Sequence, residues 1–192
     1  KRGRNMSDLY EETISSKKVY DGKIIRVKVD TVRLPDGKES SREIVEHAGA
    51  VAIVPIEDDQ IYFVKQYRKP IENVLLEIPA GKLELGEAPE ECARRELMEE
   101  IGFWPEKLEL LSSFYTSPGF SNEMLYLYLA RKLVKRQASH DPGEFLEVVV
   151  HSFPEALKKI TSREIEDGKT IIGLLMAACY FQGLGGAATE GI

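Results

Sequence analysis

Alternating apolar and polar residues dominate the chain from Ser7 to Glu46, which is the pattern of half-buried β-strands. The pattern predicts three strands, at residues 13–20, 23–34 and 39–46. Asp-Gly and Pro-Asp-Gly turn sequences separate these strands. Three short strands bury little surface by themselves. Residues 7–47 are therefore predicted to form a small N-terminal antiparallel β appendage that packs on a main domain or on another subunit.

Longer apolar runs, separated by turn sequences, follow this segment. They predict further strands at residues 48–55, 60–68, 75–78, 108–114, 124–133 and 145–151. Helical patterns occur at residues 89–101, 152–160 and 170–182, and Ser152 is expected to cap the second of these helices. The order of strands, one helix, further strands and two final helices indicates a mixed α/β domain rather than a doubly wound fold.

The helix predicted at residues 89–101 has two distinct faces. Pro89 suits its first position, and Gly102 is expected to end it. Its core-facing residues recur at every fourth position, at Ala93, Leu97 and Ile101. Its carboxylates fall on the adjoining arc, at Glu96, Glu99 and Glu100. One helix is therefore predicted both to anchor itself in the core and to display a carboxylate cluster.

The carboxylate cluster is a candidate metal site. Like charges three and four residues apart on a helix repel each other by roughly 0.2–0.5 kcal/mol per pair, so the cluster favours a site that holds cations. Oxygen ligands suit Mg²⁺, or Mn²⁺ as a substitute, better than Zn²⁺. The alternative is a solvated acidic face without a ligand, and helical spacing alone does not separate the two.

Length and composition predict a single main domain with a small appendage. The chain has 192 residues, of which 43% are hydrophobic, enough for one well-buried core. Four segments are expected: 1–6, a remnant added for expression; 7–47, the β appendage; 48–182, the main domain; and 183–192, a flexible tail.

Charge and cysteine content narrow the class of protein. The net charge is -6, with 26 Lys and Arg against 32 Asp and Glu and no basic run, so neither nucleic acid nor a membrane surface is expected as a partner. Cys92 and Cys179 have neither disulfide-framework nor zinc-site spacing. The longest apolar run, residues 171–181, is far shorter than the ~20 residues of a membrane span. A cytoplasmic protein is expected.

A complete motif covers the candidate metal helix and the loop before it. Residues 81–103 read GKLELGEAPEECARRELMEEIGF and fill every specified position of G-x5-E-x7-R-E-U-x-E-E-x-G-U, where U is an aliphatic or aromatic residue. This motif is the Nudix box, and the chain resembles the Nudix hydrolase family. The resemblance implies an α/β/α sandwich with a mixed β-sheet, in which residues 48–182 are the Nudix domain. It also implies mainly structural roles for Gly81, Glu87, Arg95 and Gly102.

A second motif narrows the resemblance. The loop Tyr115–Phe120 reads YTSPGF and places a proline sixteen positions beyond Gly102, as in the ADP-ribose pyrophosphatase subfamily. The resemblance extends from about Thr13 to Gln182. It implies Mg²⁺-dependent hydrolysis of ADP-ribose to AMP and ribose 5-phosphate, and a homodimer joined by the β appendage. The metal ligands it implies are the Ala80 carbonyl, Glu96, Glu99, Glu100 and Glu144.

The same resemblance implies which residues contact substrate. They are Arg42, Glu43, Arg68, Lys82 through its backbone, Ser117 and Glu123. The two arginines suit phosphate or ribose, since a guanidinium fork matches phosphate oxygens. Glu123 is expected to accept from the hydroxyls of the terminal ribose, and its alternative role is that of a loop-capping residue. Without the resemblance, each arginine would be read as a solvated charge at a strand end.

The catalytic base is left open by the sequence. Relatives draw a glutamate from the loop before the last strand, and Glu144 aligns best with a metal-binding glutamate there. Pro142 stands where some relatives carry the base. Glu99, Glu100 and Glu144 are the candidate catalytic residues, with Asp141 or a metal-bound hydroxide as alternatives.

Two other functions remain open at the level of sequence. A different nucleoside diphosphate derivative, such as a nucleotide sugar, NADH or a dinucleoside polyphosphate, would use the same metal cluster. A module that binds ADP-ribose without cleaving it is the alternative from another class, and the intact glutamates of the box argue against it.

Overall fold

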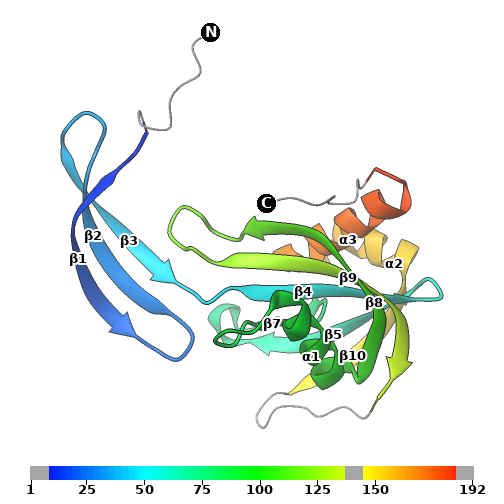
Figure 1. Cartoon of the computed structure of the whole chain (residues 1–192). Helices are drawn as coiled ribbons and strands as arrows, with labels where there is room; N and C mark the ends of the chain where they lie inside the picture. The colour runs from blue at the N-terminus through cyan, green and yellow to red at the C-terminus, as the bar shows by residue number, and fades with distance from the viewer. Residues whose placement is uncertain (1–8, 137–144, 185–192) are drawn as a thin grey trace. The chain divides into compact units, whose positions relative to one another are not determined.

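The computed structural model describes residues 9–136 and 145–184, and the chain forms two units (Figure 1). The first unit comprises the residues up to Ala48 together with Tyr115–Met124. The second comprises Gly49–Phe114 and the residues from Leu125 onward. Among the described residues, no helix is both long enough and apolar enough to cross a membrane.

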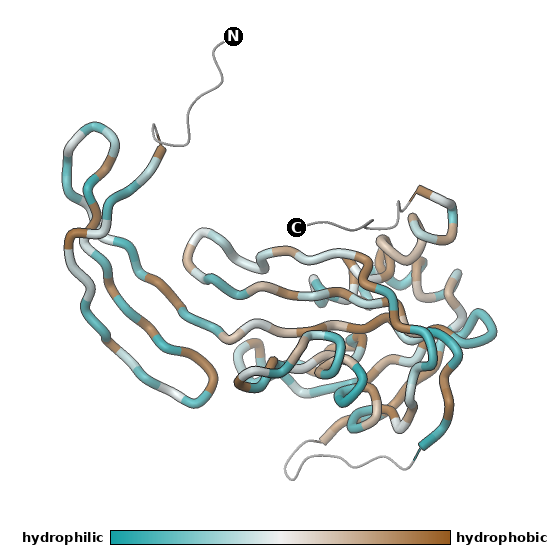
Figure 2. Tube along the Cα trace, viewed as in Figure 1, coloured by the Kyte–Doolittle hydropathy of each residue, from teal (hydrophilic) through white to brown (hydrophobic). Residues whose placement is uncertain are grey.

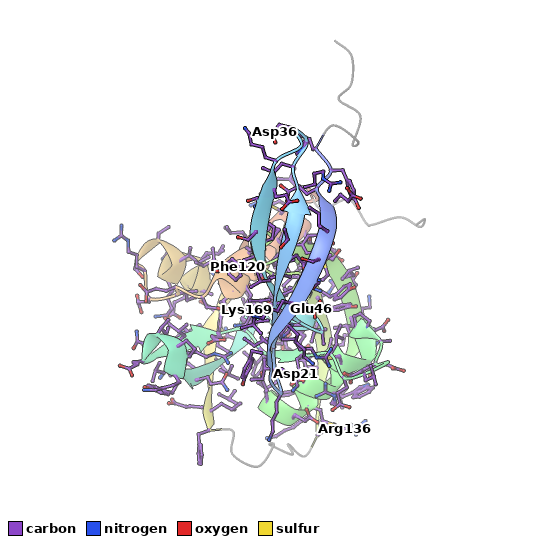
Figure 3. All side chains as sticks on the ribbon, turned by 90° about the vertical axis from the view of Figure 1, so that its left-hand side faces the viewer. Asp21, Asp36, Glu46, Phe120, Arg136 and Lys169 are labelled. Carbon is purple, nitrogen blue, oxygen red and sulfur yellow. The ribbon has the colours of Figure 1, made fainter. Side chains whose placement is uncertain are left out.

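The first unit is built on a three-stranded antiparallel sheet. Its strands are β1 (Glu12–Asp21), β2 (Arg26–Arg33) and β3 (Glu39–Glu46), in that order. Figure 3 labels Asp36 in the turn at one end of this sheet and Asp21 and Glu46 toward the other end. The small antiparallel sheet predicted from the alternating pattern is confirmed.

The loop that follows β8 belongs to the first unit because it is hydrogen-bonded to the end of β3. Val45 donates its N–H to the carbonyl of Phe120 at 2.7 Å, and Asn122 donates its N–H to the carbonyl of Val45 at 3.3 Å. The side-chain oxygen of Asn122 accepts from the N–H of His47 at 2.8 Å. Residues far apart in the sequence therefore form one unit.

The second unit contains a seven-stranded mixed sheet. Its main path is β10 (Leu146–Ser152), β5 (Gln60–Arg68), β4 (Ala50–Glu57), β9 (Met124–Lys135) and β8 (Phe103–Tyr115). β6 (Asn73–Glu77) pairs with β5, and β7 (Ala80–Lys82) pairs with β4. β4 is parallel to β9 and antiparallel to β5, so the predicted mixed sheet is confirmed.

Helices pack on both faces of this sheet. Successive residues of β4 point to opposite faces. Val51 and Ile53 pack with Leu97 of α1 (Pro89–Ile101), whereas Ala52 and Val54 pack with α2 (Phe153–Thr161) and α3 (Gly168–Phe181). Figure 2 shows hydrophobic colouring along β4, while β1 to β3 alternate. This arrangement is the predicted α/β/α sandwich.

Most predicted elements are present, and several begin or end at other residues than predicted. β8 begins at Phe103 rather than residue 108, because Gly102 adopts a φ of 72° that ends α1 and turns the chain directly into the strand. Pro105 is tolerated in β8 because β8 lies at the sheet edge. α3 begins at Gly168 because Asp167 caps it. The segment 80–82, predicted as a loop, forms the short strand β7.

Candidate active site

The Nudix-box helix presents its two predicted faces as the sequence indicates. Ala93 and Leu97 are fully buried, and Ile101 is nearly so. Their burial against β4 fixes the rotation of α1, which directs Glu96 and Glu100 toward the segment Ala80–Lys82. Glu100 is only 5% exposed, and its Oε2 accepts the N–H of Ala80 at 3.2 Å. The box loop and helix are therefore joined through Glu100.

Gly81 makes room for a carboxylate. A Cβ atom built at this position would lie 1.9 Å from the Cδ atom of Glu96. Any side chain at residue 81 would therefore displace the Glu96 carboxylate. The glycine is required here by close approach of a carboxylate to the backbone.

Arg95 connects the glutamates of the box. Its Nε and Nη2 donate to the two carboxylate oxygens of Glu87 at 2.8 and 3.0 Å. Its Nη1 donates to Glu96 at 2.7 Å and to Glu99 at 2.9 Å. This geometry fits the scaffold role expected for Arg95.

Within residues 9–136 and 145–184, no group of three or more carboxylate, histidine or cysteine side chains is arranged to hold a metal ion.

The Glu87–Arg95 pair makes a prediction about acid stability. The hydrogen bond from Arg95 lowers the pKa of Glu87 from 4.5 to about 2. A carboxylate whose pKa is depressed by folding stabilises the protein above its unfolded pKa and loses this contribution as the pH falls through its folded pKa. Glu87→Gln is expected to lower the free energy of unfolding at pH 7 by about 2 kcal/mol. The difference from wild type should shrink between pH 4.5 and pH 2.

Urea unfolding across this pH range measures the effect. Glu84→Gln is the matched control, because it removes the same charge from an exposed side chain of the same loop. A Glu87→Gln difference that stays constant between pH 7 and pH 2 would contradict the assignment.

Arg68 lies in a polar cluster next to the box. Its Nε and Nη2 donate to the Oε1 and Oε2 atoms of Glu77, both at 2.7 Å. This hydrogen-bonded pair, together with the charges of Asp167 and Glu100, raises the pKa of Arg68. Lys169 at the start of α3 also donates to Glu77. The sequence analysis did not predict that Glu77 pairs with Arg68 and Lys169. The signal for a buried ion pair was the position of Glu77 inside the apolar run LLEIPA, residues 75–80.

Of the other predicted substrate residues of the first unit, Arg42 and Ser117 have partners within it. Arg42 donates through Nε and Nη2 to Glu11 at 2.8 and 2.5 Å. Glu43 is exposed on β3. The carbonyl of Ser117 accepts the N–H groups of Phe120 and Ser121, at 3.1 and 2.9 Å, which closes the loop.

Glu123 is held by two neighbours within the first unit. Its Oε2 accepts from the hydroxyl of Thr116 at 2.5 Å, and its Oε1 lies 3.4 Å from Nδ1 of His47. These contacts fix the carboxylate and also brace the loop, so both roles predicted for Glu123 are compatible with the geometry.

In the second unit, Lys82 is exposed, and its carbonyl oxygen lies 3.4 Å from Nη2 of Arg95. Glu144, the remaining metal and catalytic candidate, and the alternative base Asp141 lie outside the described residues.

Family models agree with this architecture. The model described as the NUDIX domain matches residues 46–171. This chain belongs to the Nudix family. The model described as the nucleoside diphosphate sugar hydrolase N-terminal domain matches residues 11–45 of the Nudix protein.

Individual relatives of this Nudix protein span nearly all of it. An ADP-ribose pyrophosphatase of Bacillus subtilis (strain 168) is 47% identical over 86% of this chain and 91% of its own length. A methanol dehydrogenase activator of Bacillus methanolicus is 46% identical over 88% of this chain and 94% of its own. A crystal structure of an ADP compounds hydrolase shares the fold, with a TM-score of 0.82 and 22% identity over 91% of this chain and 96% of that chain.

Proposed function

We propose that this Nudix protein hydrolyses the diphosphate bond of ADP-ribose to AMP and ribose 5-phosphate. The observation that carries the proposal is the 47% identity to an ADP-ribose pyrophosphatase over 86% of the chain, together with the complete box. In the reaction, the oxygen of one water molecule bonds to one phosphorus, and the bond from that phosphorus to the bridging oxygen breaks. The bridging oxygen leaves on the other phosphate, and a proton is released.

The box residues fit a divalent metal, and we propose Mg²⁺, with Mn²⁺ as a substitute. The donor set is all oxygen, which is the chemistry that Mg²⁺ prefers. Gly81 leaves the space beside Ala80 to the Glu96 carboxylate, where a Cβ atom would clash. The proposed ligands are the Ala80 carbonyl, Glu96, Glu99, Glu100 and Glu144. When bound, Mg²⁺ neutralises phosphate charge and lowers the pKa of water.

The remaining roles belong to side chains that hold substrate or accept a proton. Arg68 is proposed to donate to phosphate oxygens, and Glu123 is proposed to accept from the terminal ribose hydroxyls while Thr116 and His47 hold its carboxylate. Arg42 is proposed as a further phosphate or ribose contact, and Ser117 as a further contact of the terminal ribose. Weaker contacts are proposed for Glu43 and the Lys82 backbone. Glu144 or Glu99 is proposed to take the proton from water.

A specific observation favours a second candidate, a nucleotide sugar as the preferred substrate. The N-terminal strands match a model named for nucleoside diphosphate sugar hydrolases. Both candidates share the metal chemistry and differ in the group beyond the second phosphate. Comparing kcat/KM for ADP-ribose, ADP-glucose, GDP-mannose, NADH and diadenosine polyphosphates separates them. The proposal expects the highest kcat/KM for ADP-ribose, and a preference for a nucleotide sugar would replace it.

We also propose that the protein is a homodimer joined through the first unit. β1 is exposed along its whole length, and its exposed residues include the apolar Ile14, Val19 and Tyr20. Exposed apolar side chains on an edge strand are typical of a surface that a partner covers. Light scattering is expected to give twice the chain mass of 21.6 kDa, and a monomer would contradict the proposal.

A further inference from the structure

Glu77 is a buried carboxylate in an otherwise apolar segment. It is the last residue of β6 and is 1% exposed, and the next two residues, Ile78 and Pro79, are also buried. Ala80 of the box follows directly. A buried carboxylate is costly unless its oxygens are paired with cations and donors. Its two oxygens must therefore be satisfied by neighbouring side chains.

Two cations satisfy Glu77. Arg68 donates to both carboxylate oxygens at 2.7 Å, in the parallel two-bond geometry that is the strongest arginine contact. Lys169 donates to Oε2 of Glu77, and its Nζ lies 3.0 Å from Oδ2 of Asp167. Burial tends to raise the pKa of Glu77, but the hydrogen bond from Arg68 and the charge of Lys169 outweigh burial and lower it. The carboxylate is therefore charged and held from two sides.

The start of α3, which carries Lys169 (labelled in Figure 3), fixes the position of Glu77. The hydroxyl of the neighbouring Thr170 accepts the N–H of Ile78 at 2.9 Å and donates to Asp167 at 2.6 Å. The segment after Glu77 and the start of α3 therefore hold each other in place. Glu77 is anchored on a rigid element, which the positioning of a neighbouring side chain requires.

One end of the Arg68 guanidinium is left for another partner. Nε and Nη2 donate to Glu77, whereas Nη1 has no partner among residues 9–136 and 145–184. The Arg68 side chain is 41% exposed. Its partner Glu77 lies three residues before Ala80, so the guanidinium lies close to the box. An arginine fixed on one edge and open on the other is suited to bind a phosphate oxygen.

We infer that Glu77 is a positioning residue that fixes the guanidinium of Arg68 beside the box, so that its Nη1 donates to the diphosphate of the substrate. The inference rests on the proposed function. Lys169 is the second cation that pairs with Glu77. Arg68 and Lys169 balance Glu77 and Asp167, so the cluster is neutral. Lys169 holds the Glu77 carboxylate from the other side, so it too acts on the substrate through Arg68.

A double-mutant cycle on binding tests the inference. Dissociation constants are measured by calorimetry for ADP-ribose and for inorganic pyrophosphate, with wild type, Glu77→Gln, Arg68→Ala and the double variant, in EDTA to prevent turnover. Glu77→Gln and Arg68→Ala are each expected to raise Kd about tenfold. The double variant should lie within about twofold of Arg68→Ala, because Glu77 acts only through Arg68. Two results would overturn the inference. One is a double variant whose rise in Kd equals the product of the rises in the two single variants, and the other is an unchanged Kd in Glu77→Gln.

Glu109→Gln is the matched control. Glu109 also pairs with an arginine, Arg131, which donates to it through Nε at 3.1 Å. Arg131 follows Ala130, which pairs with Pro55 near the end of β4, whereas Ala80 pairs with Ala52 near its start. Glu109→Gln is expected to leave both dissociation constants unchanged. A tenfold rise in this variant would show that loss of any arginine partner weakens binding, which would also overturn the inference.

A second variant keeps the test decisive if Glu77→Gln does not fold. Lys169→Gln removes the second cation paired with Glu77 and is expected to raise Kd for pyrophosphate several-fold, but not in an Arg68→Ala background, because Lys169 acts through Glu77 and Arg68. An unchanged Kd overturns the inference. Failure of the proposed function gives a different result: the wild type would bind pyrophosphate but would not cleave ADP-ribose. A wild type that binds neither probe overturns the inference alone, because the proposed function depends on a divalent metal that EDTA removes.

Discussion

Glu100→Gln is expected to lower kcat/KM for ADP-ribose at least about a hundredfold, because it removes the charge of a proposed metal ligand from a site that must neutralise a diphosphate. The fold should survive the change. Glu100 is buried and accepts the N–H of Ala80 at 3.2 Å, and the amide oxygen of glutamine can keep that hydrogen bond. Steady-state kinetics with saturating Mg²⁺ measures the effect, and thermal unfolding checks the fold.

Glu90→Gln is the matched control for Glu100→Gln. Glu90 lies on the same helix, with its side chain 59% exposed in an ion pair with Arg94. It carries the same charge but lies outside the proposed site. Activity in this variant should stay within about twofold of wild type, since exposed helix pairs contribute little. Near-normal turnover in Glu100→Gln would reject the metal assignment.

Gly81→Ala is expected to reduce kcat/KM for ADP-ribose by about tenfold to a hundredfold with little loss of stability. The new Cβ atom would lie 1.9 Å from Cδ of Glu96, so the Glu96 carboxylate must move away. The displaced atoms belong to the end of a flexible side chain, so the free energy of unfolding should fall by no more than about 1–2 kcal/mol. Gly81→Ala is therefore expected to lose most of its activity while keeping most of its stability.

Gly168→Ala is the control for Gly81→Ala. A Cβ atom at Gly168 meets nothing within 4 Å. The same chemical change should therefore leave activity unaltered and should raise stability slightly, because alanine restricts the unfolded chain. Wild-type activity in Gly81→Ala would show that the position of the Glu96 carboxylate does not matter, contrary to the proposed site.

The sequence predicted the elements that carry strong local patterns. α1 was predictable in both its bounds, because Pro89 begins it, Gly102 ends it and its apolar residues recur at helical spacing. Ser152 caps α2 as expected, accepting the N–H of Glu155 at 3.4 Å. The start of α3 was placed two residues too late, because the capping role of Asp167 was not recognised. Local chemistry therefore accounts for most of the fold.

Contacts between distant segments could not be predicted in this way. Lys169 lies 92 residues from Glu77, and no local pattern indicates that the two side chains meet. Arg42 was predicted as a phosphate or ribose contact, and no local pattern indicated its pair with Glu11, 31 residues away. The attachment of the loop around Phe120 to β3 likewise depends on tertiary structure. The box identifies the chemistry, whereas the supporting side chains become visible only in three dimensions.

Turnover of ADP-ribose with wild-type protein, with and without Mg²⁺, and with the products identified by mass, tests the central claim most directly. The predicted result is release of AMP and ribose 5-phosphate in equal amounts, dependent on Mg²⁺ and absent in Glu100→Gln. Tight binding of ADP-ribose in Mg²⁺ without any product would contradict the claim and would indicate a protein that binds ADP-ribose without cleaving it.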